Sequence, residues 1–389
     1  MTIQLQIIGL LVLAAQLLGA QVHSPLSQSL PPCAERPGFR DPPWIDGRRY
    51  CLENVIRDPD GGDLAFTALA AAPDGTLYAA RPHTGEVLAI TDSDGDGLPD
   101  EIRVVASDLT LPNGLAYHNG ALYISAGSRL YRLVDDQLDI LVDDVPVGSS
   151  GWGGSVIVGP DNRLYVSTSA SCDFCVPPQP ELGAVLSYAL DGSDRQIVAT
   201  GLRQAGDLAF LHGDLWATDS ARTGLIDVPN LDELNAVRWG AHFGWPYCVG
   251  KDNQPDELAG DFDCTTAAAP ALTFPTGSTP TGMVAYTSDT LPDLNGSLIV
   301  ILRGSYNQPD LRGYAVVAVR FDEQGVLLGY DLLIPFENVP AGRTGYSLSD
   351  MNYRNSGFWP YRPLDITVSR EGWLYLSVSG GQILVIRPA

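Results

Sequence analysis

The sequence predicts an all-β fold, a six-bladed β-propeller whose blades are four-stranded antiparallel sheets. The first observation is a hairpin that recurs six times, each time a strand, a tight polar turn and a second strand opening near a Leu, at 73–78, 119–123, 161–165, 212–216, 295–298 and 371–375. The first copies lie 40 to 50 residues apart, which is the length of one blade. The 41 glycines and 29 prolines suit many short strands and turns. A β-sandwich is the competing all-β fold, but sandwiches do not repeat one hairpin so regularly.

The N-terminal segment predicts export. Residues 1–20 contain no charged side chain and carry an apolar run that ends before the polar Gln21, which is the order of a secretory signal peptide. A retained membrane anchor is the alternative, although so short an apolar run spans a bilayer poorly. We therefore expect a secreted or periplasmic protein with no membrane span in its mature form, beginning with a leader segment over 21–51.

The propeller domain is expected over 52–389. Leu52–Asp58 has the composition of a strand without a hairpin partner, and we expect it to pair into the last blade and close the ring, which removes exposed sheet edges. Third strands are predicted after four of the hairpins, at 85–90, 129–133, 184–188 and 313–319. Two stretches, 221–280 and 322–361, break the regular spacing and are predicted to be functional insertions.

Six cysteines in an exported chain predict disulfides. Six cysteines allow about 15 pairings. Proximity along the chain favours Cys33 with Cys51, Cys172 with Cys175, and Cys248 with Cys264. A redox-active site at Cys172–Cys175 is the alternative, but no βαβ unit surrounds this pair.

The charge balance limits the partners and the chemistry. The formal net charge is -23, from 46 acidic and 23 basic residues. Nucleic-acid binding needs a basic face, so nucleic acid is excluded as a partner. Only one lysine, Lys251, is present, and this argues against a Schiff-base mechanism.

The inner strand of each propeller blade lines the central tunnel, so the residues just before it surround one mouth of the tunnel. With one residue from the end of a second strand, the mouth positions are Asn113, Trp152, Arg203, Gln204, Thr281, Arg303 and Arg362. A guanidinium group binds a carboxylate in bidentate fashion, so the arginines predict a site for a planar polycarboxylate ligand. The alternative is structural salt bridging to Asp207, Asp365 or a similar neighbour.

An acidic loop is a separate signal. Asp92, Asp94 and Asp96 alternate before a glycine, as in the first half of a calcium-binding loop. The usual Glu at the twelfth position is absent, and Asp100 or Glu101 can take its place. The loop predicts a structural Ca2+ between the first and second blades, with a solvated acidic turn as the alternative.

Several motifs follow one another in a fixed order: A-T-G-L-R-Q at 199–204, D-L-W at 214–216, D-E-L-N at 232–235, G-W-P-Y-C at 244–248 and R-P at 362–363. Together they resemble the glucose/sorbosone dehydrogenase family, and the similarity extends from about Leu64 to the C-terminus. The resemblance implies a six-bladed propeller that binds pyrroloquinoline quinone (PQQ) and Ca2+ over the tunnel mouth and oxidises a sugar.

The resemblance also implies roles for single residues. The mouth residues expected to contact PQQ are Trp152, Arg203, Gln204, Arg303 and Arg362. Gln204 stands where the family usually has Asn, and Arg303 where it commonly has His or Lys. Main-chain carbonyls at Gly244 and Pro246 are expected to help hold the cofactor calcium, a cation that prefers oxygen ligands.

The chain departs from the family at the catalytic base. The family places a histidine before the third inner strand to take the proton from the sugar hydroxyl, and this chain has Gly151 there. General-base help is worth roughly 100 to 10,000-fold. His242 and Asp207 are the candidate replacements. Each also has a structural interpretation, as a loop histidine making a hydrogen bond and as a carboxylate paired with Arg203.

We therefore expect a sugar dehydrogenase that uses PQQ and Ca2+, takes a small-molecule sugar as substrate and is slowed by the loss of the usual base. No motif indicates the electron acceptor. Two other functions compete with this interpretation. One is a non-catalytic propeller that binds a ligand or partner on the same scaffold. The other is a calcium-dependent lactonase-type hydrolase, although the sequence shows no acidic metal cluster of that kind.

Overall fold

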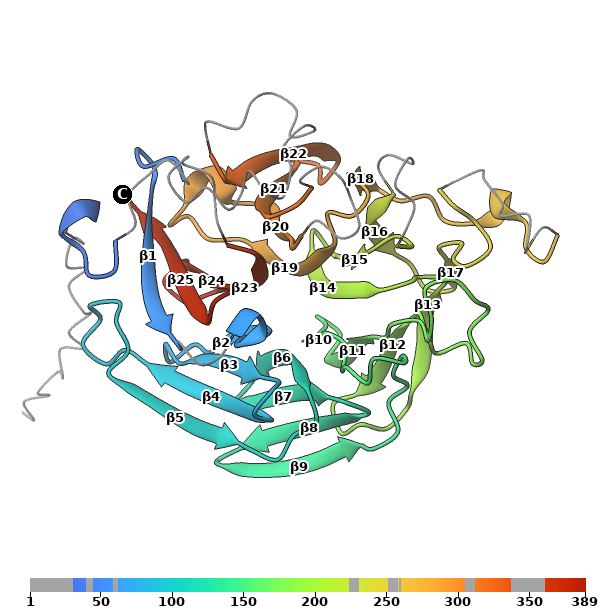
Figure 1. The fold of residues 1–389 in the computed structure, drawn as a ribbon, viewed down its shortest axis with the longest axis horizontal. Coiled ribbons are helices and arrows are strands. Elements are labelled where there is room, and N and C mark those ends of the chain that lie inside the picture. The colour runs from blue at the N-terminus through green and yellow to red at the C-terminus, as the bar shows by residue number, and fades with distance from the viewer. Residues whose placement is uncertain are drawn as a thin grey trace, which may run out of the picture.

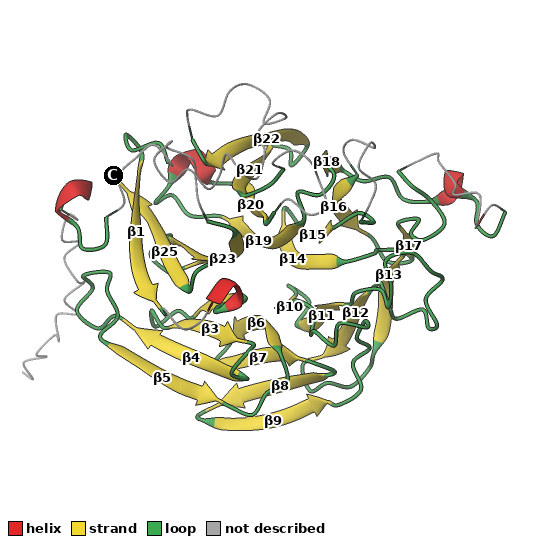
Figure 2. Ribbon diagram, in the orientation of Figure 1, coloured by secondary structure: helices red, strands yellow, loops and turns green. Residues whose placement is uncertain are grey.

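The structure is a computed structural model. It describes residues 31–39, 45–58, 62–223, 231–250, 258, 260–304, 312–336 and 361–389. Within these residues the strands form six sheets arranged around one axis (Figure 1). The helices among them are short 3-10 turns outside the sheets (Figure 2), at Cys33–Glu35, Gly62–Leu64, Cys264–Thr266 and Pro292–Leu294. The predicted six-bladed β-propeller is confirmed.

Blades 1 to 3 follow the chain in order. Blade 1 is built from β2 (Ala68–Ala71), β3 (Leu77–Arg81), β4 (Glu86–Thr91) and β5 (Glu101–Ala106). Blade 2 is built from β6 (Pro112–His118), β7 (Ala121–Ala126), β8 (Arg129–Val134) and β9 (Gln137–Val142). Blade 3 is built from β10 (Val156–Val158), β11 (Arg163–Ser167), β12 (Val185–Ala189) and β13 (Gln196–Thr200), and it gains a fifth, parallel strand, β17 (Ala241–His242).

Blades 4 to 6 complete the ring. Blade 4 is built from β14 (Ala205–Leu211), β15 (Asp214–Asp219), β16 (Asp232–Val237) and β18 (Leu272–Phe274). Blade 5 is built from β19 (Pro280–Tyr286), β20 (Ser297–Leu302), β21 (Ala315–Phe321) and β22 (Leu327–Ile334). Blade 6 is built from β23 (Pro363–Val368), β24 (Leu374–Val378), β25 (Gln382–Pro388) and the N-terminal β1 (Tyr50–Arg57).

Each predicted hairpin forms the two innermost strands of a blade. In blade 2, Asn119 and Gly120 connect β6 to β7 with φ angles of 47° and 84°. Two successive residues with positive φ match the right-handed twist of the flanking strands, and Asn-Gly adopts that conformation at low cost. The local turn residues therefore set the hairpin register.

The ring closes as predicted, because β1 pairs antiparallel with β25. The carboxylate of Glu53 on β1 binds the guanidinium of Arg387 on β25, with Arg387 Nε 2.9 Å from Glu53 Oε1, and Arg36 contributes a second guanidinium at 3.4 Å. All three side chains are buried. Removing one partner leaves a buried charge uncompensated, which costs about 3–5 kcal/mol.

The apolar core lies between neighbouring sheets. Between blades 4 and 5, Leu234 and Phe274 pack in one cluster with Val300 and Val317, and all four are fully buried. Truncating a side chain in such a layer costs about 2–5 kcal/mol. The core thus holds the inner strands, and with them the tunnel mouth, in fixed positions.

Both predicted insertions were partly wrong. The stretch 221–280 contains β16 and β18, the outer strands of blade 4, and 322–361 contains β22, the outer strand of blade 5. Burial explains the difference for β16, where Leu234 is fully buried between two blades. Residues 337–360 lie outside the described part of the chain.

The three expected disulfides are present, at Cys33–Cys51, Cys172–Cys175 and Cys248–Cys264. None of the helices in the described residues has the length and apolar character needed to cross a membrane. The predicted signal peptide at 1–20 lies outside the described residues, as do 21–30 and 40–44 of the predicted leader.

Candidate cofactor site at the tunnel mouth

The predicted mouth lies over a cavity of about 670 Å³ that follows the central tunnel. Residues from the inner strands of all six blades line it. Among the predicted mouth residues, those that line this cavity are Asn113, Trp152, Gln204, Thr281 and Arg303. Arg203 and Arg362 are next to lining residues but outside the lining itself. The propeller register therefore brings most of the predicted site together.

Arg203 is held in place by its neighbours. Its Nε and Nη2 lie 2.9 and 2.6 Å from Asp173 Oδ1, and its Nη1 donates to the Ser220 carbonyl at 3.1 Å. The side chain is 13% exposed. The structural alternative named Asp207 or Asp365 as its carboxylate partner, and this was wrong. The partner is Asp173, which lies far away in sequence, in the turn of blade 3.

Arg362 and Arg303 lie next to each other between blades 5 and 6. Arg362 Nη2 donates to Tyr314 Oη at 3.0 Å, and its guanidinium carbon is 5.1 Å from the centre of the Tyr314 ring. Gly304 makes this possible, because a Cβ there would approach Arg362 Nε to 2.9 Å. Arg303 faces the cavity. Together with Arg203, blades 4, 5 and 6 each contribute one guanidinium around the mouth.

Asp207 and Asp365 lie deeper, on the inner strands of blades 4 and 6. Asp207 accepts from the N–H of Met283 at 2.6 Å and of Leu208 at 2.8 Å, and from the Ser155 hydroxyl. Asp365 accepts from the N–H of Leu69 at 2.6 Å. Burial raises the pKa of Asp207 to about 6, and burial together with the charge of Asp207 raises the pKa of Asp365. Both carboxylates face the tunnel and connect neighbouring blades.

His242 packs away from the cavity lining. Its ring stacks on Phe262 at 4.4 Å between centroids, and its Nδ1 accepts from the N–H of Gly244 at 3.0 Å. Burial lowers the pKa of this imidazole. His242 therefore supports the turn that carries Gly244 and Pro246. This turn is anchored to the strand before Arg203, because the N–H of Trp245 donates to the Gly201 carbonyl at 2.9 Å.

Blade 4 also holds a buried group of carboxylates that the sequence analysis did not predict. Glu233 on β16 lies opposite Asp219 on β15, and Asn235 lies two residues further along the same face. Burial raises the pKa of Glu233 to about 8 and that of Asp219 to about 6. Asn235 donates to Glu233 through its amide nitrogen, while its buried Oδ1 has no hydrogen-bond partner among the described residues.

The turn at Gly244 covers this same face of blade 4. Phe243 packs in one cluster with Ala217 and Val237, and these two residues are on the side of the β15–β16 pair that carries Glu233 and Asn235. The main-chain N–H of Arg203 donates to Asp219 at 3.0 Å. Oxygen atoms that could act as metal ligands therefore lie between the Gly244 turn and Arg203.

Comparison with known proteins assigns the scaffold. The sequence model of the glucose/sorbosone dehydrogenase family matches residues 132–326, half of the chain. The chain belongs to this family. An uncharacterized protein of Borreliella burgdorferi is 24% identical over 296 residues, which cover 70% of this chain and 74% of that protein.

Solved structures of glucose/sorbosone dehydrogenase-like proteins share the fold. A Trichoderma reesei protein of carbohydrate-active enzyme family AA12 is 17% identical over 91% of this chain and 99% of that chain, with a TM-score of 0.72. The holo PQQ domain of pyranose dehydrogenase from Coprinopsis cinerea is 15% identical over 90% of this chain and 99% of that chain, with a TM-score of 0.69. The PQQ-bound aldose sugar dehydrogenase from Streptomyces coelicolor is 17% identical over 90% of this chain and 100% of that chain, with a TM-score of 0.58.

In this chain the position expected to hold a base is open. Gly151 has a φ of 73°, and a Cβ there would meet no atom within 4 Å. The next residue, Trp152, packs edge-to-face against the ring of His83, with centroids 6.5 Å apart. His83 is exposed and follows β3 of blade 1, so it reaches the mouth from the end of a second strand. Arg303 was predicted at the mouth because it lies at the end of a second strand, and the same reasoning applies to His83.

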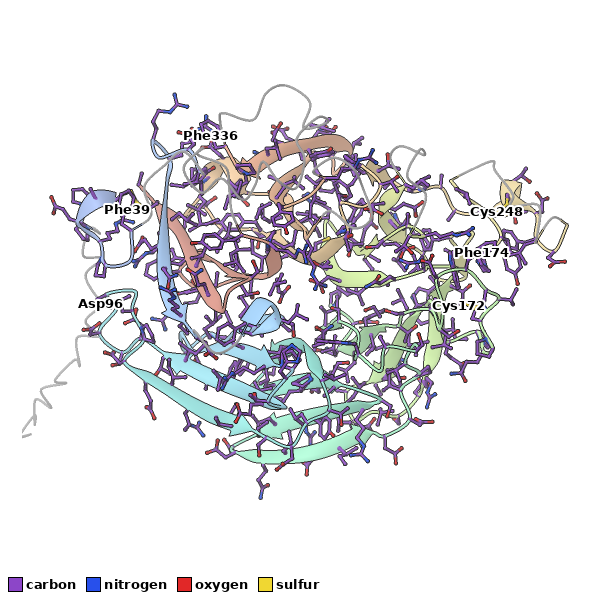
Figure 3. All side chains as sticks on the ribbon, viewed as in Figure 1. Phe39, Asp96, Cys172, Phe174, Cys248 and Phe336 are labelled. Carbon is purple, nitrogen blue, oxygen red and sulfur yellow. A yellow bond between two sulfur atoms is a disulfide. The ribbon has the colours of Figure 1, made fainter. Side chains whose placement is uncertain are left out.

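The acidic loop lies on the other face of this glucose/sorbosone dehydrogenase scaffold, because it connects β4 to β5. Ligand atoms of Asp92, Asp94 and Asp100 all lie within 4.8 Å of one another. Asp96 is outside that group, and its carboxylate accepts from the N–H of Leu98. Figure 3 shows Asp96 at the opposite edge of the molecule from Cys172. The calcium assignment for this loop stays a prediction.

Proposed function

We propose that the protein is an exported quinoprotein-type dehydrogenase that oxidises an aldose or related sugar with PQQ and Ca2+ at the tunnel mouth. The observation that carries the proposal is the set of three arginines at the tunnel mouth of a glucose/sorbosone dehydrogenase scaffold, with Arg303 lining the cavity and Arg203 and Arg362 just outside its lining. Guanidinium groups suit the carboxylates of PQQ, because they bind a carboxylate in bidentate fashion.

The residues present fit both cofactors. Trp152, Gln204 and Arg303 line the cavity on which a planar group can lie. For calcium, the candidate ligands are the carbonyls of Gly244 and Pro246, the carboxylate of Glu233, and Asn235 Oδ1, which has no partner among the described residues. A hard cation that takes six to eight oxygen ligands suits such a donor set. When bound, PQQ supplies the electron sink for oxidation of a sugar hydroxyl to a carbonyl.

The proton of that hydroxyl needs an acceptor from the chain. Asp207 faces the cavity, and a pKa near 6 places it close to the range in which a carboxylate is an effective base. His83 is a second acceptor, at the rim beside Trp152. His242 is supported less well, because it stacks on Phe262 and does not line the cavity.

A non-catalytic binding propeller is the second candidate, and Gly151 is the observation that favours it. The two are separated by adding PQQ and Ca2+ to the purified apoprotein and following quinone absorbance and dye reduction with a panel of aldoses and sugar alcohols. Binding with turnover supports the dehydrogenase. Binding without turnover supports the binding propeller, and absence of binding overturns the dehydrogenase and the cofactor-binding role of the arginines.

Restoring the base tests the chemistry directly. If sugar reaches the mouth, Gly151→His is expected to raise the rate of dye reduction by about 100-fold, since general-base help is of at least this size. Gly213→His is the matched control, because Gly213 also has a positive φ, 84°, and open space around a Cβ, but lies in the hairpin turn on the other face. A rate no higher in Gly151→His than in this control would contradict catalysis at the mouth.

A further inference from the structure

The turn of blade 3 that is closed by the Cys172–Cys175 disulfide contacts blade 4 beside Arg203. Cys172 and Cys175 bracket Asp173 and Phe174, and Figure 3 shows Cys172 and Phe174 together at this edge of the propeller. Asp173 accepts from the N–H of Thr223 at 2.9 Å and from its hydroxyl at 2.8 Å. The ring of Phe174 lies 4.1 Å from the guanidinium carbon of Arg222. Two adjacent side chains thus attach the turn to residues 222 and 223 of the neighbouring blade.

The main chain of Arg203 is fixed on both sides. Its N–H donates to Asp219 Oδ2 at 3.0 Å, and its carbonyl accepts from the N–H of Ala170 at 2.8 Å. The backbone therefore leaves only the side-chain torsions to vary. Asp173 determines those torsions, because its Oδ1 accepts from both Nε and Nη2 of Arg203.

The geometry leaves the other edge of the guanidinium for a ligand. The contacts with Asp173, Ser220 and Gln204 use four of the five N–H groups that an arginine carries. The remaining N–H is on Nη2, and the longest of the four contacts, at 3.5 Å, runs from Nη1 to Oε1 of Gln204, a residue that lines the cavity. The Nη2 N–H, together with the Nη1 N–H that would exchange Gln204 for the ligand, can donate to a carboxylate in bidentate fashion.

We propose that Asp173 is a positioning residue that holds Arg203 by one edge and so presents the opposite edge to a carboxylate ligand at the tunnel mouth. The inference rests on the proposed function for the identity of that ligand, the tricarboxylate PQQ. Fixing a long side chain in its bound orientation removes an entropic cost that binding would otherwise meet. The Cys172–Cys175 disulfide keeps the turn closed around Asp173, so the orientation of Arg203 depends on it.

Binding of PQQ in the presence of Ca2+ tests the proposal, measured by calorimetry on the full chain. Asp173→Ala is expected to weaken PQQ affinity by about tenfold, the scale of a charge-assisted hydrogen bond. Asp173→Asn is expected to lose less, because its side-chain oxygen can still accept from Nε. Asp144→Ala is the matched control, since it removes an outer Arg–Asp pair with Arg195, and neither residue lines the cavity. Affinity in Asp173→Ala equal to or above that of the wild type would overturn the proposal.

A second measurement needs no quinone. In the apoprotein the Nε–H resonance of Arg203 is expected to be sharp and protected from exchange, and to broaden in Asp173→Ala and in the Cys172→Ser/Cys175→Ser variant. The double variant is preferred to a reducing agent, which would also open the other two disulfides. An unchanged resonance would refute the positioning role. A broadened resonance in a protein that never binds PQQ would support the role and reject the proposed function.

Discussion

Two acidic clusters in this protein differ in where their carboxylates come from. The loop at 92–100 gathers its carboxylates from neighbouring positions in sequence, and its members satisfy one another's backbone N–H groups in the open. The group at Asp219 and Glu233 forms across two strands, and is buried in blade 4 beneath the Gly244 turn. A contiguous motif is visible in sequence, whereas a cluster made by strand register is not.

The two clusters also differ in electrostatic state. In the loop, hydrogen bonds from Ser93 hold the pKa of Asp100 below its usual value. In blade 4, burial raises the pKa of Glu233 to about 8, so that in the apoprotein this carboxyl is largely protonated at neutral pH. A buried carboxyl that a nearby cation would ionise has the character of a functional site, and a solvated loop needs no such explanation.

The largest expected effect is on cofactor binding. Glu233→Gln keeps the shape of the side chain but removes the negative charge, so we expect the calcium-dependent affinity for PQQ to fall by about 100-fold, the upper range for lost metal-site groups. The same change in the exposed loop, Asp100→Asn, is expected to leave that affinity unchanged. Titration of quinone absorbance at fixed calcium measures both. Equal affinities in Glu233→Gln and the wild type would remove Glu233 from the site.

The next effect concerns the stability of the apoprotein. The ordinary pKa of a Glu carboxyl is 4.5, and burial raises that of Glu233 to about 8. At pH values between these two, Glu233 is protonated in the folded state and ionised in the unfolded chain. The folded state then binds more protons, so stability falls as pH rises through this window, by up to about 1.4 kcal/mol per pH unit for one proton. Asp219, with its pKa near 6, adds to the lower part of the window.

Glu233→Gln removes that proton and should flatten the dependence of the unfolding free energy on pH between 5 and 8. Denaturant unfolding of apoprotein at several pH values measures the slope. Glu101→Gln, at the exposed start of β5, is the control and should keep the wild-type slope. If both variants keep it, the buried carboxyl does not hold a proton in the folded state.

The contrast between local and non-local signals also explains what the sequence could and could not predict. The hairpins, the closing strand β1 and the three disulfides follow from turn residues, apolar runs and proximity along the chain, and all are present. The strand nature of 232–237 was missed, because polar residues at its start hide a strand buried between blades. The partner of Arg203 was missed because Asp173 approaches it from another blade.

The smallest expected effect belongs to the exposed loop. Asp92, Asp94 and Asp100 offer three carboxylates within 4.8 Å, so saturating calcium is expected to raise the Tm of the apoprotein by about 2–4 °C through this loop. The Asp100→Asn variant should lose that increase, because the loop then has one fewer charged ligand, while Glu233→Gln should keep it. Thermal unfolding with and without calcium in both variants assigns the shift to one cluster or the other. An increase that survives in Asp100→Asn and disappears in Glu233→Gln would place the calcium response of the apoprotein in blade 4, and would make the exposed loop a solvated acidic turn.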